Sequence, residues 1–180
     1  MKKLLLTALI CAAALPAFAA TPIKLSLWDG IAVPNVRIVN GLELGLGGSN
    51  DSVTGLQFDL VWAKSQNITG WQLSFIFADA GKMTGLQTAL VNKAGAAKGV
   101  QLGAVNYAAD RSGVQLGAVN WSDNSAVFQW GFVNYAKRMS GLQLGVVNYT
   151  EHIDKGLQIG LANFAKNGWF PVMILVNGRF

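Results

Sequence analysis

The sequence predicts an all-β protein built from short repeats, and three observations support this. Gly141–Asn148 reads G-L-Q-L-G-V-V-N, and close copies of this unit recur along the chain. Apolar residues, most of them bulky, occupy the second, fourth and sixth positions of nearly every unit, with Gln and a small or polar residue between them. This alternation has the period of a β-strand, whereas the repeated glycines disfavour a helix. A short polar run follows most copies and is typical of a turn.

The copies begin 14 or 15 residues apart throughout. A fixed short period indicates that each copy is one structural unit packed against its neighbours. No linker interrupts the rhythm, so residues 20–180 are predicted to form a single repeat-built β domain. The unit starts are residues 41, 55, 70, 85, 99, 113, 127, 141, 156 and 170.

The N-terminus has the features of a secretory signal peptide. Two lysines precede an apolar run from Leu4 to Leu15, and small residues follow up to Ala19. This pattern predicts a signal peptide over residues 1–19 and an exported mature chain. The only cysteine, Cys11, lies inside this segment, so no disulfide is predicted.

Charge is confined to the turns of the later units. From residue 70 onward, the first eight positions of every unit contain no Asp, Glu, Lys or Arg. One strand face is therefore bulky and apolar, and the other is small and uncharged. Soluble sheets usually expose charged side chains, so the pattern favours lipid on one side and a narrow polar lumen on the other. The scattered basic residues predict no nucleic-acid binding.

The favoured architecture is an up-and-down antiparallel, outer-membrane-type β-barrel of about 10–12 short strands. The C-terminus supports it, because Val172, Ile174, Val176 and Phe180 share one face and resemble the insertion signal of bacterial outer-membrane barrels. The strands are short for this role, since roughly 9–11 tilted residues are needed to cross a membrane.

The alternative architecture is a parallel β-solenoid with one 14–15-residue coil per repeat. Identical side chains would then stack into ladders between coils. Barrels usually duplicate by hairpin, with alternating unit types, and the chain lacks that alternation. The predicted ladders are a Gln column (Gln57, Gln72, Gln87, Gln101, Gln115, Gln129, Gln143, Gln158) and an Asn column (Asn92, Asn106, Asn120, Asn134, Asn148, Asn163, Asn177).

The sequence of the repeat and the closing V-N-G-R-F resemble those of a family of Gram-negative surface-repeat proteins with tandem G-x-Q-x-G-x-V-N-Y segments. The resemblance covers nearly all of the mature chain. It implies an exported envelope protein, and it brings no settled activity and no site residues.

Candidate catalytic residues are sparse, and no catalytic, cofactor or metal site is predicted. His152 is the only histidine and lies in a turn between Glu151 and Asp154. One histidine with two carboxylates is too few for a metal site, and no G-x-S-x-G elbow is present.

The predicted function is therefore non-enzymatic: an outer-membrane protein that serves as a structural barrel or a narrow pore. Its expected partners are outer-membrane lipid and the barrel-assembly machinery. The alternative is a surface-attached β-solenoid that acts as a binding or adhesion module, and an envelope enzyme is the least favoured. In the barrel, the lumen would be lined by the eight glutamines of the Gln column together with Glu43 and Asp59.

Overall fold

The computed structural model describes residues 20–180, and every regular element in that range is a β-strand. The signal peptide predicted for residues 1–19 lies outside the described residues. None of the described residues forms a helix that could cross a membrane. The strands are β1 (Thr21–Trp28), β2 (Ile31–Val33), β3 (Ile38–Ser74), β4 (Phe77–Thr88), β5 (Val91–Leu102), β6 (Val105–Ala108), β7 (Arg111–Leu116), β8 (Val119–Trp130), β9 (Val133–Leu144), β10 (Val147–Ala165) and β11 (Val172–Arg179).

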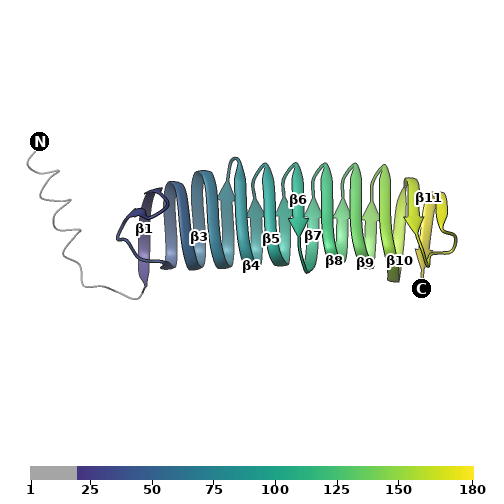
Figure 1. The fold of residues 1–180 in the computed structure, drawn as a ribbon, viewed down its shortest axis with the longest axis horizontal. Coiled ribbons are helices and arrows are strands. Elements are labelled where there is room, and N and C mark those ends of the chain that lie inside the picture. The colour runs from purple at the N-terminus through teal and green to yellow at the C-terminus, as the bar shows by residue number, and fades with distance from the viewer. Residues whose placement is uncertain (1–19) are drawn as a thin grey trace, which may run out of the picture.

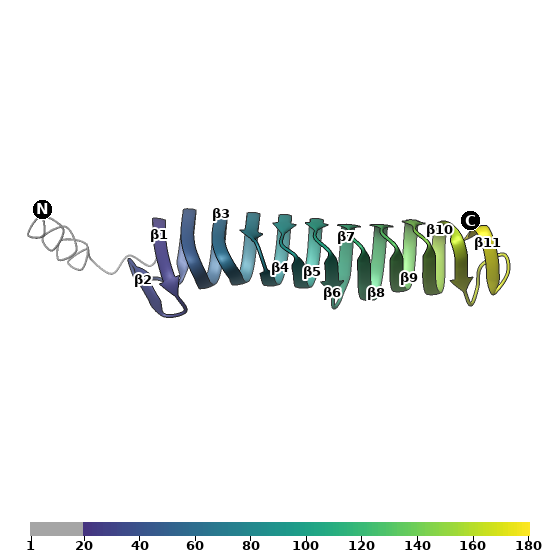
Figure 2. The same cartoon turned by 90° about the horizontal axis from the view of Figure 1, so that it is seen from above.

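The strands stack along one axis as the coils of a parallel β-solenoid (Figure 1 and Figure 2). Neighbouring coils run in the same direction and keep the repeat in register. Gln87 of β4 lies opposite Gln101 of β5, and Gln143 of β9 lies opposite Gln158 of β10. Each repeat therefore forms one coil, and its successor lies directly on top of it.

The prediction of an antiparallel barrel is wrong, and its alternative, the parallel solenoid, is confirmed. An up-and-down barrel needs antiparallel neighbours, but among the described strands only the pairs β1–β2 and β10–β11 are antiparallel. The sheet has an open order from β11 to β2. The physical reason lies in the repeat itself, because identical units in the same direction place identical amides at bonding distance.

The ends of the solenoid differ from its middle. At the N-terminal end, β1 lies parallel to β3 and forms a hairpin with β2. At the C-terminal end, β11 reverses direction and pairs antiparallel with β10 (Figure 1). Terminal units of this kind cover a stack that would otherwise present a free edge to further strands.

The interior of each coil is narrow and is crossed by side-chain amides. Gln129 donates from Nε2 to the carbonyl oxygen of Tyr135 at 3.0 Å, and Asn134 donates from Nδ2 to that of Leu144 at 2.8 Å. These bonds join the two long sides of a coil. The bulky Leu, Val and aromatic residues of the repeat point outward, so the coil is polar inside and apolar outside.

The two predicted ladders form along most of the solenoid. In the Gln column the amides from Gln72 onward donate to the preceding coil, as Gln115 does to Gln101 at 2.9 Å. In the Asn column the amides from Asn92 to Asn148 donate to the following coil, as Asn120 does to Asn134 at 2.9 Å. These side chains have no exposed surface, and the bonds between neighbouring amides remove most of the cost of burying them.

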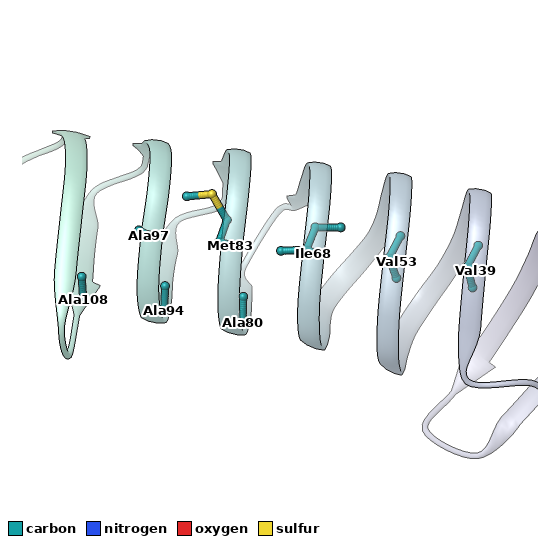
Figure 3. Close-up of a cluster of buried hydrophobic side chains, with 8 residues drawn as sticks. All are labelled: Val39, Val53, Ile68, Ala80, Met83, Ala94, Ala97 and Ala108. Carbon is teal, nitrogen blue, oxygen red and sulfur yellow. The ribbon is translucent and has the colours of Figure 1, made fainter. Parts of the chain in front are cut away.

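Apolar residues fill the remaining interior space. In the N-terminal half they form one cluster of buried residues, drawn in Figure 3: Val39, Val53, Ile68, Ala80, Met83, Ala94, Ala97 and Ala108. A second, smaller cluster contains Met139, Ile153 and Ala165. These buried side chains are mostly small, which keeps the two long sides of the coil close enough for an amide to reach across.

Candidate functional surface

The residues predicted to line a barrel lumen lie inside the coils instead. All eight glutamines, Glu43 and Asp59 have no exposed surface. They do point inward, as the alternation indicated, but the space they enter is closed by the opposite side of the same coil. They therefore line no channel, and the pore loses its structural basis.

The first coils contain a buried polar cluster that sequence analysis did not anticipate. Lys24 Nζ lies 3.4 Å from Glu43 Oε1 and donates to Asn50 Oδ1 at 2.7 Å. Ser26 Oγ donates to Glu43 Oε1 at 2.6 Å, and Asn50 Nδ2 donates to the other carboxylate oxygen. Lys24 and Ser26 come from β1 and their partners from β3, so parallel pairing of these strands assembles the cluster. It compensates a charge pair that would be costly to bury alone.

Asp59 lies beside this cluster and is poorly compensated. It accepts a hydrogen bond from Gln57 Nε2 at 2.9 Å, while its Oδ1 has no partner. Burial first, and then the negative charge of Glu43, raise the pKa of Asp59 from 3.8 to about 7. The carboxyl group is sealed from solvent, so substrate has no access to it, and the cluster serves the interior of the fold.

The charged turns contain the single histidine of the chain, His152. His152 is half exposed, and its Nε2 lies 3.5 Å from Asp154 Oδ1 and 3.3 Å from Asn167 Nδ2. Within residues 20–180, no group of three or more His, Cys, Asp or Glu side chains is placed to hold a metal ion. The outer surface of the solenoid is consequently the candidate functional site.

Each coil bends at a corner between its two long sides, and the corners of successive coils line up along the solenoid. We call the apolar residues at these bends the apolar edge. The chain bends here just after the fourth position of the repeat, and the bulky residues point away from the interior. Phe75, Phe132 and Leu161 are 63%, 68% and 64% exposed. The apolar edge comprises Leu46, Leu60, Val61, Phe75, Ile76, Leu90, Ala104, Ala118, Phe132, Val146 and Leu161.

Two flanks extend the apolar surface on either side of this edge. The Leu flank holds the second and fourth positions of the repeat, such as Leu142 and Trp130. The Val flank holds the seventh position, such as Val133 and Val147, on the other long side. A shallow groove crosses the edge where Trp130 and Phe132 rise beside Ala118.

The Val flank ends in an aromatic column made of Tyr107, Trp121, Tyr135, Tyr149 and Phe164. Three of these rings stack along the solenoid, with centroids 3.9 Å apart for Trp121 and Tyr135 and 5.5 Å apart for Tyr135 and Tyr149. Their polar atoms point away from the apolar edge. Tyr107 Oη donates to Asp123 at 2.5 Å and Trp121 Nε1 donates to the same carboxylate at 2.6 Å. The hydrogen bond from Tyr107 lowers the pKa of Asp123.

The opposite corner is a charged edge that carries most of the charges of the later coils. Arg138 forms two hydrogen bonds with Asp154, at 2.7 and 3.2 Å, and Lys166 lies 3.5 Å from Glu151. The charged edge comprises Lys82, Asp110, Arg111, Asp123, Lys137, Arg138, Glu151, His152, Asp154, Lys155 and Lys166. The outside of the coil is thus amphipathic, with its polar side restricted to one corner.

The C-terminal residues predicted as an insertion signal lie on or near β11. Val172, Ile174 and Phe180 are exposed and Val176 is partly buried. Leu175 adopts a positive φ of 69° and is exposed beside Ile174, so the alternation is broken between them. The role of these residues as an insertion signal stays a prediction.

Sequence reasoning found the alternation but missed the edge and the aromatic column as surfaces. The apolar sixth position was visible in every copy, yet only the bend places it on a corner. Likewise, the aromatic residue that follows five of the column Asn residues is evident in the sequence, but its stacking needs coils that run in the same direction.

No protein-family model matches the chain, and no curated protein or solved structure matches it either.

Proposed function

We propose that this protein is an exported, surface-attached β-solenoid that acts as a non-catalytic binding or adhesion module. The single observation that supports it most is the inverted distribution of polarity. The amides of the repeat lie inside, while its Leu, Val and aromatic residues form continuous columns on the outside. Large contiguous apolar surfaces on exported chains are typical of attachment or partner sites.

Two further features agree with this proposal. The resemblance to Gram-negative surface-repeat proteins and the signal-like N-terminus both favour export to the envelope. The solenoid also offers one long, regular surface rather than a pocket that encloses a substrate, and extended surfaces of this kind are what repeat proteins use for binding.

Cell fractionation tests the proposal. The full chain is expressed in a Gram-negative host, and the envelope fraction is washed in turn with high salt, urea and mild detergent. We expect the processed protein in the envelope fraction, resistant to salt and released by detergent. Recovery as a freely soluble protein in the periplasm or the medium would contradict surface attachment.

A further inference from the structure

The apolar surface is widest over the C-terminal coils, residues 99–165. There the Leu flank, the apolar edge and the Val flank follow one another without a charged side chain. In the earlier coils Lys64, Asp79 and Lys93 occupy the position of the aromatic column, so the Val flank borders directly on charged side chains. The C-terminal coils therefore present an apolar surface on three sides of their outline.

This three-sided distribution indicates which partner fits. A second copy of the chain would cover one side of the coil and leave another apolar side in water. A fluid layer of acyl chains covers all three sides at once, because it adapts to a ridge. The chemistry of the surface thus favours lipid over a flat protein interface.

The backbone at the edge also tolerates an environment without water. Gly117 N–H donates to Trp130 O at 3.0 Å, and Gly131 N–H donates to Leu144 O at 3.0 Å. The buried Asn120 donates from inside to the same Trp130 oxygen at 2.9 Å. An edge that enters hydrocarbon must satisfy its backbone polar groups internally, and bonds between coils do this here.

The aromatic column lies between the apolar surface and the charged edge. Its rings are apolar, while the Tyr107 hydroxyl and the Trp121 indole N–H bond toward Asp123 at the charged edge. Tyr and Trp residues with this orientation are enriched at the boundary between lipid and water. Tyr149 in the column lies three residue steps after Val146 on the edge, which spans roughly 10 Å at ~3.3 Å per residue.

We propose that the C-terminal coils lie sideways in one leaflet of a lipid bilayer. The apolar edge enters the acyl chains, the aromatic column lies at the level of the headgroups, and the charged edge remains in water. The depth of roughly 10 Å suits an interfacial element and is less than the ~15 Å half-thickness of the hydrocarbon core. This inference rests on the proposed function and names its partner.

Vesicle binding of matched variants tests this placement. The first variant carries Phe132→Glu and Val146→Glu on the apolar edge, at positions 68% and 41% exposed. The control carries Thr84→Glu and Ser140→Glu, which add the same charge at exposed positions beside Lys98 and Lys155. All versions keep the same N-terminus, and circular dichroism confirms that each is folded.

The probe is a vesicle of phosphatidylcholine and phosphatidylglycerol, with brominated acyl chains for fluorescence quenching. We expect bromine to quench the exposed Trp130 and the edge variant to bind at least tenfold more weakly. The control should bind within twofold of the unchanged protein. Equal binding by both variants, or no binding by the unchanged protein, overturns the inference.

Two outcomes separate this inference from the proposed function. Attachment to whole envelopes without binding to pure lipid vesicles would overturn the lipid placement and leave surface attachment standing. Vesicle binding by a protein that fractionates as soluble in cells would overturn surface attachment and leave the lipid placement standing. A dimer in lipid-free solution that the edge variant disperses, without vesicle binding, would assign the surface to a second copy and overturn the lipid placement.

Discussion

The N-terminal coils, residues 41–91, and the C-terminal coils, residues 99–165, fill the same outline with different interiors. In the C-terminal coils the column of buried Asn faces a glycine at the bend. A Cβ added to Gly131 would lie 2.7 Å from Asn120 Nδ2, so the glycine makes room for the amide. In the N-terminal coils Ala78 takes the place of Asn, and Ala89 takes the place of glycine.

The exchange continues toward the N-terminus. Ala63 and Ser74 form the equivalent pair one coil earlier, and Gly48 and Asp59 form the pair before that. A Cβ added to Gly48 would lie 2.8 Å from Asp59 Oδ2. Here the side chain of Asp59, at the bend, fills the space, and the position of the Asn column is occupied by Gly48. In each coil the side chains at the column position and at the facing bend position therefore have a similar combined volume, while the residue at either position can differ.

The buried atoms that lack partners lie where the interior of the coils changes or where a ladder ends. Each ladder has one end at which an acceptor has no donor. The Asn ladder begins at Asn92, whose Oδ1 faces Ala78, and the Gln ladder ends at Gln158, whose Oε1 has no glutamine beyond it. The other two atoms belong to bend residues of the N-terminal coils. The complete set among residues 20–180 is Asp59 Oδ1, Ser74 Oγ, Asn92 Oδ1 and Gln158 Oε1.

The largest expected effect concerns Asp59 in the N-terminal coils. Its pKa is raised from 3.8 to about 7, so the folded state retains a proton that the unfolded state releases. The stability linked to this proton is present in full below pH 3.8 and is lost as pH rises through about 7. Between about pH 5 and about pH 8 the free energy of unfolding should fall by about 3 kcal/mol, at ~1.4 kcal/mol per pKa unit.

Urea unfolding of the unchanged protein and of Asp59→Asn at both pH values measures this difference. The variant should lose most of the pH dependence, because its amide does not titrate. An unaltered pH dependence in the variant would show that another group is responsible.

In the C-terminal coils, Asn120→Ala should be costly. The change removes the hydrogen bonds to Asn134 and to Trp130 O and opens a cavity. It also removes one of the two acceptors of Asn106 Nδ2. We expect a loss of about 2–3 kcal/mol in the free energy of unfolding, measured by urea denaturation. The control is Asn124→Ala, an exposed amide bonded to Asp110, with an expected loss below ~0.5 kcal/mol. Equal losses would mean that the ladder adds nothing.

A C-terminal interior can be transplanted into the N-terminal coils. Ala78→Asn alone should bring no gain, because the methyl group of Ala89 occupies the space of the amide. When Ala89→Gly is added, the introduced amide should donate to the unpartnered Oδ1 of Asn92. A double-mutant cycle of thermal stability should then give a favourable coupling of about 1 kcal/mol. Additive effects of the two changes would contradict volume exchange between these positions.

The smallest effect is expected outside both interiors, at the charged edge. Arg138 forms two hydrogen bonds with Asp154, but its side chain is 56% exposed. Arg138→Ala should lower the free energy of unfolding far less than Asn120→Ala does, because water screens exposed ion pairs. A larger loss in urea denaturation would indicate that the turns, and not the ladders, hold the coils together.

Much of the fold can be predicted from the repeat, but the relative direction of neighbouring strands cannot. Alternation placed Gln143 inward and Leu144 outward, and this holds in the structure. Both a barrel and a solenoid satisfy that alternation, because a period of two residues says nothing about whether neighbouring strands are parallel. The Gln and Asn columns favoured parallel stacking, while the terminal Phe180 and the charge-free strand cores outweighed them.

The candidate surface was predictable only in part. The apolar sixth position was evident from the sequence, but its place on an outer corner depends on the bend at residues such as Gly131. The cluster around Lys24 was missed because its partners lie far along the chain. Asn50 is 26 residues away and meets Lys24 only when β1 pairs with β3. Alternation within one strand holds no information about such a contact.

The opposite donor directions of the two ladders have a consequence for the evolution of chain length. Amide dipoles aligned in one column add up along a stack, as peptide dipoles do in a helix. Here one column points toward the first coil and the other toward the last, so their fields largely cancel. A coil can accordingly be duplicated or deleted without building up an axial dipole, which leaves the number of repeats open to change in whole steps.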